Sequence, residues 1–292
     1  MFERLSRSYH LMRHSWSLLV KDKELMVFPL LSGLGSLLTV GSFMVPVVTY
    51  VMHHNGQQID VESTHLQAYW YGLMFLFYLL TFFITYYFNV AVMHCAAIRM
   101  DGGDPTVADG FRGANAHALR IFGWAAVSAT VGLLLRALEE RMGLLGRIVI
   151  SLVGCAWAVV TYFAMPVLIF EQVGVGGAVK RSAELLKRSW GEAMVANAGV
   201  GMVFSYLSLL GFIPVGLGAW AAASGAPLIG VAVASGAVFY WLCLAIVSSA
   251  LSSIFRVALY RYAATGQVPE GYPAELISTH FQPKPARRFF GR

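Results

Sequence analysis

Long apolar stretches separated by short charged segments dominate the sequence. Between Glu192 and Arg256 the chain runs for 63 residues without an Asp, Glu, Lys or Arg. A helix needs about 20 apolar residues to cross the hydrocarbon core of a bilayer, so this stretch is long enough for two crossings and a turn. Further charge-free stretches lie at 25–59, 63–98 and 148–170. The pattern predicts a polytopic membrane protein of the all-α class.

These stretches predict six transmembrane helices. The expected spans are 25–51, 68–98, 115–136, 148–170, 193–221 and 227–256. The third is the shortest, because only 15 residues separate Arg120 from Arg136, roughly 22 Å of helix against a core of roughly 30 Å. We expect either that both arginines extend to the headgroups, with the span beginning near Ala114, or that this helix is short and re-entrant.

Proline positions predict where the spans are irregular. Pro29, Pro46, Pro166 and Pro214 all lie inside expected spans, and a proline removes one backbone hydrogen bond and bends a helix. Pro214 lies between Gly211 and Gly216. We therefore expect a bent or broken fifth helix at that point.

Composition and charge agree with this interpretation. The 292 residues are 58% hydrophobic and 12% charged, whereas soluble domains carry about 25% charged residues. A soluble α/β enzyme of this length is therefore excluded. With the amino terminus inside, 18 of the 21 Lys and Arg residues fall in cytoplasmic segments, and such asymmetry sets orientation. We expect both termini in the cytoplasm, and the positive charge needs no nucleic-acid partner.

A short repeat stands before two of the spans. RSYHLMRHSW at 7–16 and RSAELLKRSW at 181–190 share five of ten positions without a gap. Each copy has the spacing of an amphipathic helix that lies in the headgroup plane. A related helix is expected to begin at Pro105, capped by Asp104. The residues expected to contact lipid headgroups are Arg7, Arg13, Trp16, Arg181, Lys187 and Trp190.

The repeat also predicts the domain organisation. We expect a six-span domain at 1–262, built from pseudo-repeated units near 1–99, 100–170 and 171–262, each with a cytoplasmic interfacial helix. A basic cytoplasmic tail follows at 263–292. Duplicated units are common in transporters, but a duplicated scaffold would have the same pattern, so the repeat does not choose between these functions.

Several loop and helix-entry motifs resemble those of uncharacterised six-span bacterial membrane proteins. The motifs are FPLLSG at 28–33, DGGDPTVADGFR at 101–112, EQ at 171–172 with GAVKRSAELLKRSWG at 177–191, and VPEGY at 268–272. That family is distantly similar to the membrane domain attached to some glycerophosphodiester phosphodiesterases. The resemblance implies a bacterial inner-membrane location and the six-span fold. It carries over no catalytic residue.

Few residues in the sequence suggest a catalytic, metal-binding or polar ligand site. The outer loop contains His53, His54 and His65, which could hold a metal ion, although their spacing matches no established site and a solvated loop is the alternative. Inside the spans no Asp, Glu, Lys or Arg is expected at mid-membrane, which argues against proton relays and carboxylate chemistry. A possible intramembrane polar site comprises Asn89, His94 and Asn197.

Three functions remain open. The favoured hypothesis is a non-catalytic membrane protein without a cofactor, which binds anionic lipid headgroups at the cytoplasmic face or organises protein partners, including copies of itself. The second is a transporter or channel for a neutral or amphipathic solute. The third is a metal-dependent membrane enzyme, which rests on the outer histidine loop alone.

Overall fold

The computed structural model describes residues 19, 22–53 and 64–266. These residues are almost wholly helical and contain no strand, which confirms the predicted all-α class. The elements in order are η1 (Lys23–Met26), α2 (Val27–His53), α3 (Thr64–Met100), α4 (Val107–Ala116), α5 (Ala118–Arg141), α6 (Leu144–Val160), α7 (Ala164–Phe170), α8 (Val175–Leu210), α9 (Phe212–Ala223) and α10 (Pro227–Thr265).

Six segments of the described chain are long and apolar enough to cross a membrane. They are Lys23–Thr49, Tyr69–Met100, Ala118–Arg141, Leu144–Phe170, Gly201–Ala223 and Pro227–Thr265. Each coincides with one expected span, so the predicted number of crossings is confirmed. The chain is therefore a multi-pass membrane protein with a helical bundle fold.

The third span is a full-length helix. α5 has 24 residues, about 36 Å of helix, so it is long enough for the core that it must cross. It begins at Ala118, after a turn at His117, rather than near Ala114. Both arginines in question bond to protein groups: Arg120 Nη1 donates to the Leu168 carbonyl (3.3 Å), and Arg136 Nη1 donates to the Tyr78 hydroxyl (2.9 Å).

The chain divides into two compact units that are discontinuous in sequence. The first comprises Met1–Pro29, Cys95–Val107 and Glu184–Arg292, as far as these are described. The second comprises Leu30–His94 and Ala108–Ala183. This division differs from the expected repeat units, and the repeat itself stays a prediction.

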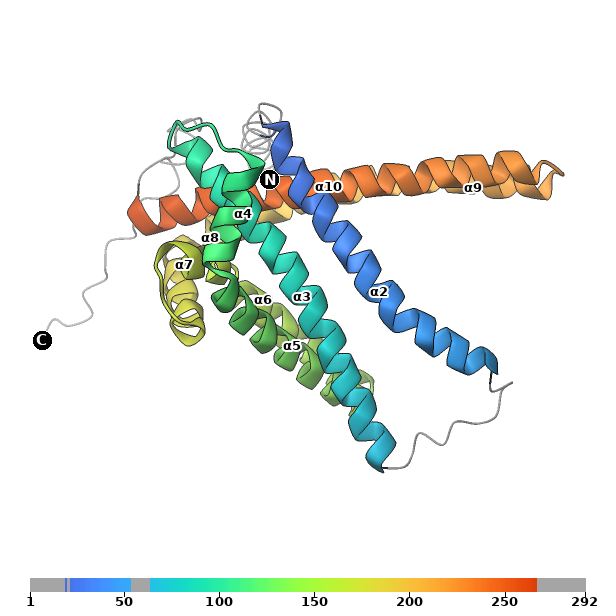
Figure 1. Cartoon of the computed structure of the whole chain (residues 1–292), viewed down its shortest axis with the longest axis horizontal. Coiled ribbons are helices and arrows are strands. Elements are labelled where there is room, and N and C mark those ends of the chain that lie inside the picture. The colour runs from blue at the N-terminus through green and yellow to red at the C-terminus, as the bar shows by residue number, and fades with distance from the viewer. Residues whose placement is uncertain (1–18, 20–21, 54–63, 267–292) are drawn as a thin grey trace, which may run out of the picture. The chain divides into compact units, whose positions relative to one another are not determined.

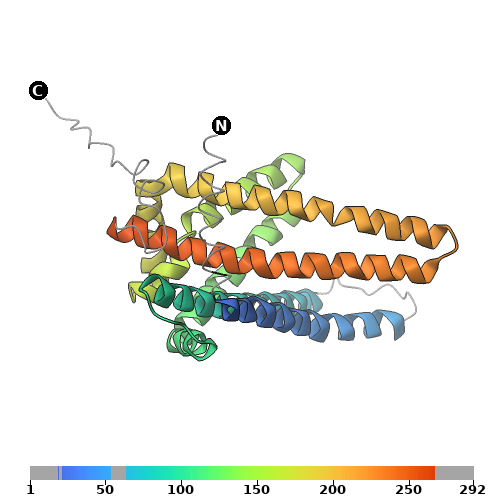
Figure 2. The same cartoon turned by 90° about the horizontal axis from the view of Figure 1, so that it is seen from above.

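In the first unit, α9 and α10 form a long antiparallel hairpin (Figures 1 and 2). The turn between them passes through Gly225, whose φ of +89° few other residues adopt. The two helices approach closely at Gly218 and Gly230, because a Cβ on Gly230 would lie 2.6 Å from the Gly218 carbonyl oxygen. α10 ends at Thr265 and is followed by Gly266, a left-handed cap whose N–H bonds to the Tyr262 carbonyl.

In the second unit, α5 and α6 form a shorter hairpin (Figure 1). α3 contributes a ladder of aromatic rings. Tyr78, Phe82 and Tyr86 stack one helical turn apart, and the Tyr86 hydroxyl donates to Ser128 of α5 (3.1 Å). Trp124 of α5 stacks on Trp157 of α6. The Tyr86–Ser128 hydrogen bond joins α3 to α5, and the Trp124–Trp157 stack joins α5 to α6.

The repeat segment 181–190 is not a separate helix. It lies within α8, a single helix of 36 residues that continues into the fifth span. The fifth span is instead interrupted at Gly211, between α8 and α9, which confirms the expected break beside Pro214.

Candidate functional site

The first polar site lies at the end of α3 in the first unit. We call it the charged cluster, which comprises Asp22, Glu24, Arg99, Asp101, Asp104 and Arg261. The Arg99 guanidinium donates from Nε and Nη2 to both carboxylate oxygens of Asp22, and from Nη2 to Asp104. The Asp22 side chain is 6% exposed, and a buried carboxylate is stable only when it is paired. Asp22 and Arg99 therefore form a structural contact between the start of the first span and the end of the second.

A second ion pair of the charged cluster joins α10 to the loop after α3. Arg261 donates from Nη2 to Asp101 (2.8 Å) and to the Ala97 carbonyl (3.4 Å). Hydrogen bonds from Arg261 hold the pKa of Asp101 below its ordinary value, although partial burial opposes this. The pair ties the end of the sixth span to the loop that follows the second.

The first residue of α4 and the residue that caps it both differ from those expected. The helix begins at Val107 instead of Pro105, and Asp104 binds Arg99. Glu24 of η1 accepts a hydrogen bond from the Val107 N–H (3.2 Å), so a carboxylate 83 residues away takes the capping role. A carboxylate at this position is favourable because the first N–H groups of a helix have no partner within the helix.

The fourth span is broken between α6 and α7, and Ser182 bonds both sides of the break. Its hydroxyl donates to the Val160 carbonyl (2.6 Å) and accepts from the Phe163 N–H (3.0 Å), and the residue is 0% exposed. Pro166, in the first turn of α7, removes a further N–H from the helix. Two backbone groups that the break frees are therefore satisfied by a side chain from α8.

The break in the fifth span is capped in a similar way. The Tyr240 hydroxyl donates to the Leu207 carbonyl (2.7 Å), and Trp241 Nε1 donates to the Ser208 carbonyl (3.0 Å). Gly211 leaves the space that the Trp241 ring occupies, because a Cβ there would overlap the indole. Backbone irregularity at membrane depth is tolerated where the freed groups find partners in the protein or line a water-filled cavity.

The second polar site lies in the second unit, where α4 packs on α3. A Cβ on Gly113 would overlap the His94 ring, so the glycine allows the two helices to come close. The Tyr87 hydroxyl of α3 donates to Asn115 Oδ1 of α4 (2.7 Å). His117 lies after α4, with Nδ1 2.8 Å from the Gly113 carbonyl oxygen. These contacts hold α4 against the second span.

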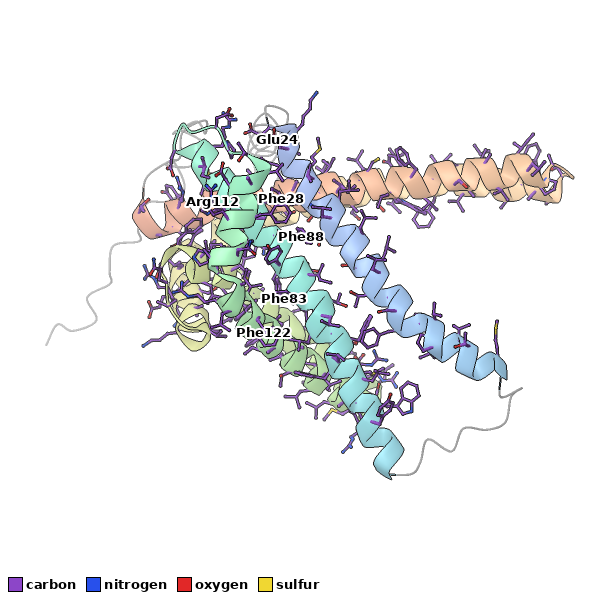
Figure 3. All side chains as sticks on the ribbon, in the orientation of Figure 1. Glu24, Phe28, Phe83, Phe88, Arg112 and Phe122 are labelled. Carbon is purple, nitrogen blue, oxygen red and sulfur yellow. The ribbon has the colours of Figure 1, made fainter. Side chains whose placement is uncertain are left out.

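Arg112 projects from the exposed side of α4. It pairs with Asp109 through Nη1 (2.8 Å), and its side chain is 78% exposed. A continuous row of five rings lies near it, which we call the aromatic row: Phe88, Phe111, Tyr87, Phe83 and Phe122. Successive ring centroids are separated by 6.2, 6.5, 6.0 and 6.0 Å. Figure 3 shows the labelled members of the row on α3 and α5.

The predicted site residues fall into two groups. Eight of them cannot be placed. Four lie outside the described residues, namely Arg7, Arg13, Trp16 and His54, and for four more the side chains are not described, namely His53, His65, Trp190 and Asn197. The remaining four are described. Arg181 pairs with Glu171 through Nε (2.9 Å), Lys187 is exposed, and Asn89 and His94 are half-buried on α3. Contact of these residues with lipid headgroups, or with a solute, stays a prediction.

The charged cluster and Ser182 were not among the predicted site residues. The carboxylates carried a signal, because Asp22, Asp101 and Asp104 lie within five residues of a basic residue near the end of an expected span. Ser182 carried a weaker signal, because it is a small polar residue that follows a basic residue and precedes apolar positions of the same helix. Neither signal names the partner, which depends on how the helices pack.

The comparisons with known proteins identify a family. Residues 68–270 match the family of unknown function DUF6159. The chain belongs to this family. The DUF6159 match includes α4, Ser182, both helix breaks and Arg261, so most of the geometry above lies within the matched region. No curated protein and no solved structure matches the chain.

Proposed function

We propose that this protein is a non-catalytic integral membrane protein that binds lipids of the cytoplasmic leaflet, with both termini on the cytoplasmic side of a bacterial inner membrane. One observation carries the proposal: at each helix break, protein side chains bond two backbone groups beside the break. Discontinuous helices in transporters instead direct free backbone groups at the substrate.

The arginines at the helix ends support the same conclusion. Arg99, Arg181 and Arg261 each pair with carboxylates of the protein. Charged groups retained within a span are usually functional when they face a cavity or pathway. These three serve to hold helices and loops together, which suits a scaffold that presents its outer surface to ligands.

The outer surface is apolar on the helices of both units. Leu38 of α2 is 75% exposed, and Leu228 and Val238 of α10 are 85% and 63% exposed. Exposed apolar area of this extent marks a surface that contacts lipid or other membrane helices. Lipid is the ligand we favour for this surface. The alternative form of the proposal is that the same surface binds protein partners or a second copy of the chain.

The resemblance to the membrane domain of glycerophosphodiester phosphodiesterases adds no activity to the proposal, because the comparisons give it no support. The resemblance stays a prediction. The polar contacts described above contain no arrangement of nucleophile and base, so the proposal includes no reaction.

Binding of defined lipids by the full chain tests the proposed function. The purified protein is titrated in detergent with phosphatidylglycerol or phosphatidylcholine, at low and at high salt, and bound lipid is counted by native mass spectrometry. We expect phosphatidylglycerol to bind more tightly, with a preference that falls as salt rises, because screening weakens contacts between exposed charges. Equal binding of the two lipids at both salt concentrations would contradict the proposal.

A second function, transport of a neutral or amphipathic solute, is favoured by one observation. Two consecutive spans, the fourth and the fifth, are both interrupted near a proline, and interrupted helices often surround transport sites. Solute flux into proteoliposomes, measured against protein-free vesicles, tests it. Flux that depends on the protein would favour transport over the lipid-binding function.

A further inference from the structure

We propose that α4 and the first turns of α5 form a binding site for one anionic phospholipid of the cytoplasmic leaflet. The inference rests on the proposed function and assigns it to a place. Its first basis is a line of exposed residues, Arg112, Asn115, Leu119 and Phe122, whose spacings of three, four and three match one face of a helix. Arg112 is 78% exposed, Leu119 84% and Phe122 47%.

The line is only slightly interrupted where α4 passes into α5. The turn consists of His117 alone, whose N–H bonds to the Ala114 carbonyl (3.1 Å) and whose carbonyl accepts from the Ile121 N–H (2.9 Å). Helical hydrogen bonding thus continues on both sides of the turn. Figure 3 shows Arg112 and Phe122 on this segment, with Phe83 and Phe88 of α3 near it.

The order of side chains along the line matches the order of groups in a phospholipid. A guanidinium comes first, then an amide, then an alkyl chain, and then a ring that lies within the third span. A phospholipid presents a phosphate, then ester groups, then acyl chains along the same direction into the bilayer. Each class of group would therefore meet a side chain of matching polarity.

The polar end of the site has donors available for a phosphate. Arg112 uses Nη1 for Asp109 (2.8 Å), and a guanidinium has five N–H donors, so further donors remain for a second anion. The pair with Asp109 also restrains the guanidinium, which reduces the entropy lost on binding. Asn115 accepts from Tyr87 through Oδ1 (2.7 Å), which leaves its NH₂ group as a donor.

The apolar end is bordered by the aromatic row. Phe83 meets Phe122 edge-to-face with centroids 6.0 Å apart, and Phe83 is followed one turn later by Tyr87. Rings of this kind present large, rigid apolar surface with few rotatable bonds. They would pack along the upper part of an acyl chain, next to the exposed Leu119.

These features favour a lipid over a soluble phosphate. A free phosphate would engage one guanidinium that already has a carboxylate partner, and it would leave Leu119 and Phe122 uncovered. A lipid with the same phosphate also covers the apolar residues. The occupant we infer is therefore a phosphodiester anion attached to acyl chains.

The experiment compares the full chain with single-residue variants in the titration described above. Arg112→Gln removes the guanidinium, and Phe122→Ala removes the ring at the other end. Lys180→Gln is the matched control, because Lys180 is an exposed basic residue of the same unit and its loss changes net charge equally. The soluble probe is glycerol 3-phosphate, which has the phosphate without acyl chains.

We expect Arg112→Gln to weaken phosphatidylglycerol binding about fivefold, the effect of one basic residue near an anionic surface, and Lys180→Gln to leave it unchanged. Phe122→Ala should weaken phosphatidylglycerol and phosphatidylcholine alike, because both have acyl chains. Equal losses for Arg112→Gln and Lys180→Gln would overturn the site while leaving the proposed function in place. Binding of glycerol 3-phosphate as tight as that of the lipid would also overturn it. If the unchanged chain does not prefer phosphatidylglycerol, the proposed function itself fails.

Discussion

Replacing Ser182 with alanine should destabilise the protein more than any comparable change at an exposed serine. The Ser182 hydroxyl bonds two backbone groups at once, the Val160 carbonyl (2.6 Å) and the Phe163 N–H (3.0 Å). Alanine leaves both without that partner in a position that is 0% exposed. Water has no access there to replace the lost hydrogen bonds.

The magnitude follows from the two groups that lose their partner. A buried donor or acceptor left unsatisfied costs about 1–3 kcal/mol, whereas side-chain hydrogen bonds in membrane proteins average about 0.6 kcal/mol and reach about 1.7. The Ser182 site lies towards the upper range, because a backbone carbonyl and a backbone N–H lose their partner together. We expect a loss of about 2–4 kcal/mol in the free energy of unfolding.

Equilibrium unfolding by sodium dodecyl sulfate in mixed micelles measures this loss. Ser235→Ala is the matched control, because the Ser235 hydroxyl bonds only to Val231 in its own helix and the residue is exposed. The control should change stability by less than about 0.5 kcal/mol. If Ser182→Ala and Ser235→Ala had equal effects, the capping of the fourth-span break by Ser182 would be refuted.

Two further predictions concern the first unit. Gly230→Ala should lower the free energy of unfolding by about 1–3 kcal/mol, because the added Cβ would lie 2.6 Å from the Gly218 carbonyl oxygen. Gly236→Ala is the control and should change stability little, because the space around Gly236 is open. Equal unfolding midpoints for the two variants would contradict the close approach of α9 and α10. Asp101→Asn should lower stability near neutral pH by about 0.5 kcal/mol, a small value because the carboxylate is 64% exposed. Arg261 holds the pKa of Asp101 below 3.8, so the ionised group stabilises the fold above that pH, and the difference should disappear as pH falls through the lowered pKa. A difference that persists in stronger acid would show that the ion pair is not its cause.

The spans were predictable because hydrocarbon imposes a simple condition on sequence. A crossing needs a long apolar helical segment, and each of the six expected spans overlaps one such segment of the structure. The break at Gly211 was predictable for a related reason, since Pro214 has no N–H to donate to the preceding turn. These features depend on the local chain alone.

The partners of the polar residues were not predictable in this way. Asp104 has the position and chemistry of a helix cap, yet it binds Arg99, while Glu24 bonds the first N–H of α4. Glu24 and Val107 are 83 residues apart. Which carboxylate reaches which donor depends on the packing of three separate segments, and the local pattern contains no information about it.

The repeat shows the same limit within a single motif. Its helical spacing correctly predicts a helix at 181–190, and its position before a span suggests a separate helix in the headgroup plane. The structure continues that helix into the fifth span. Arg181 and Ser182, at the start of the motif, bond Glu171 and the fourth-span break. Periodicity identifies a face of a helix, but it does not identify what the face contacts.

Labelling of single cysteines in intact cells tests the membrane arrangement most directly. The natural cysteines Cys95, Cys155 and Cys243 are first replaced, and one cysteine is then placed at Asp104, Lys180, Met142 or Gly225. A maleimide that does not cross membranes should label the last two positions, which follow the third and fifth spans, and should label the first two only after the cells are opened. Labelling of position 104 or 180 in intact cells would contradict a six-span protein whose α4 faces the cytoplasmic leaflet.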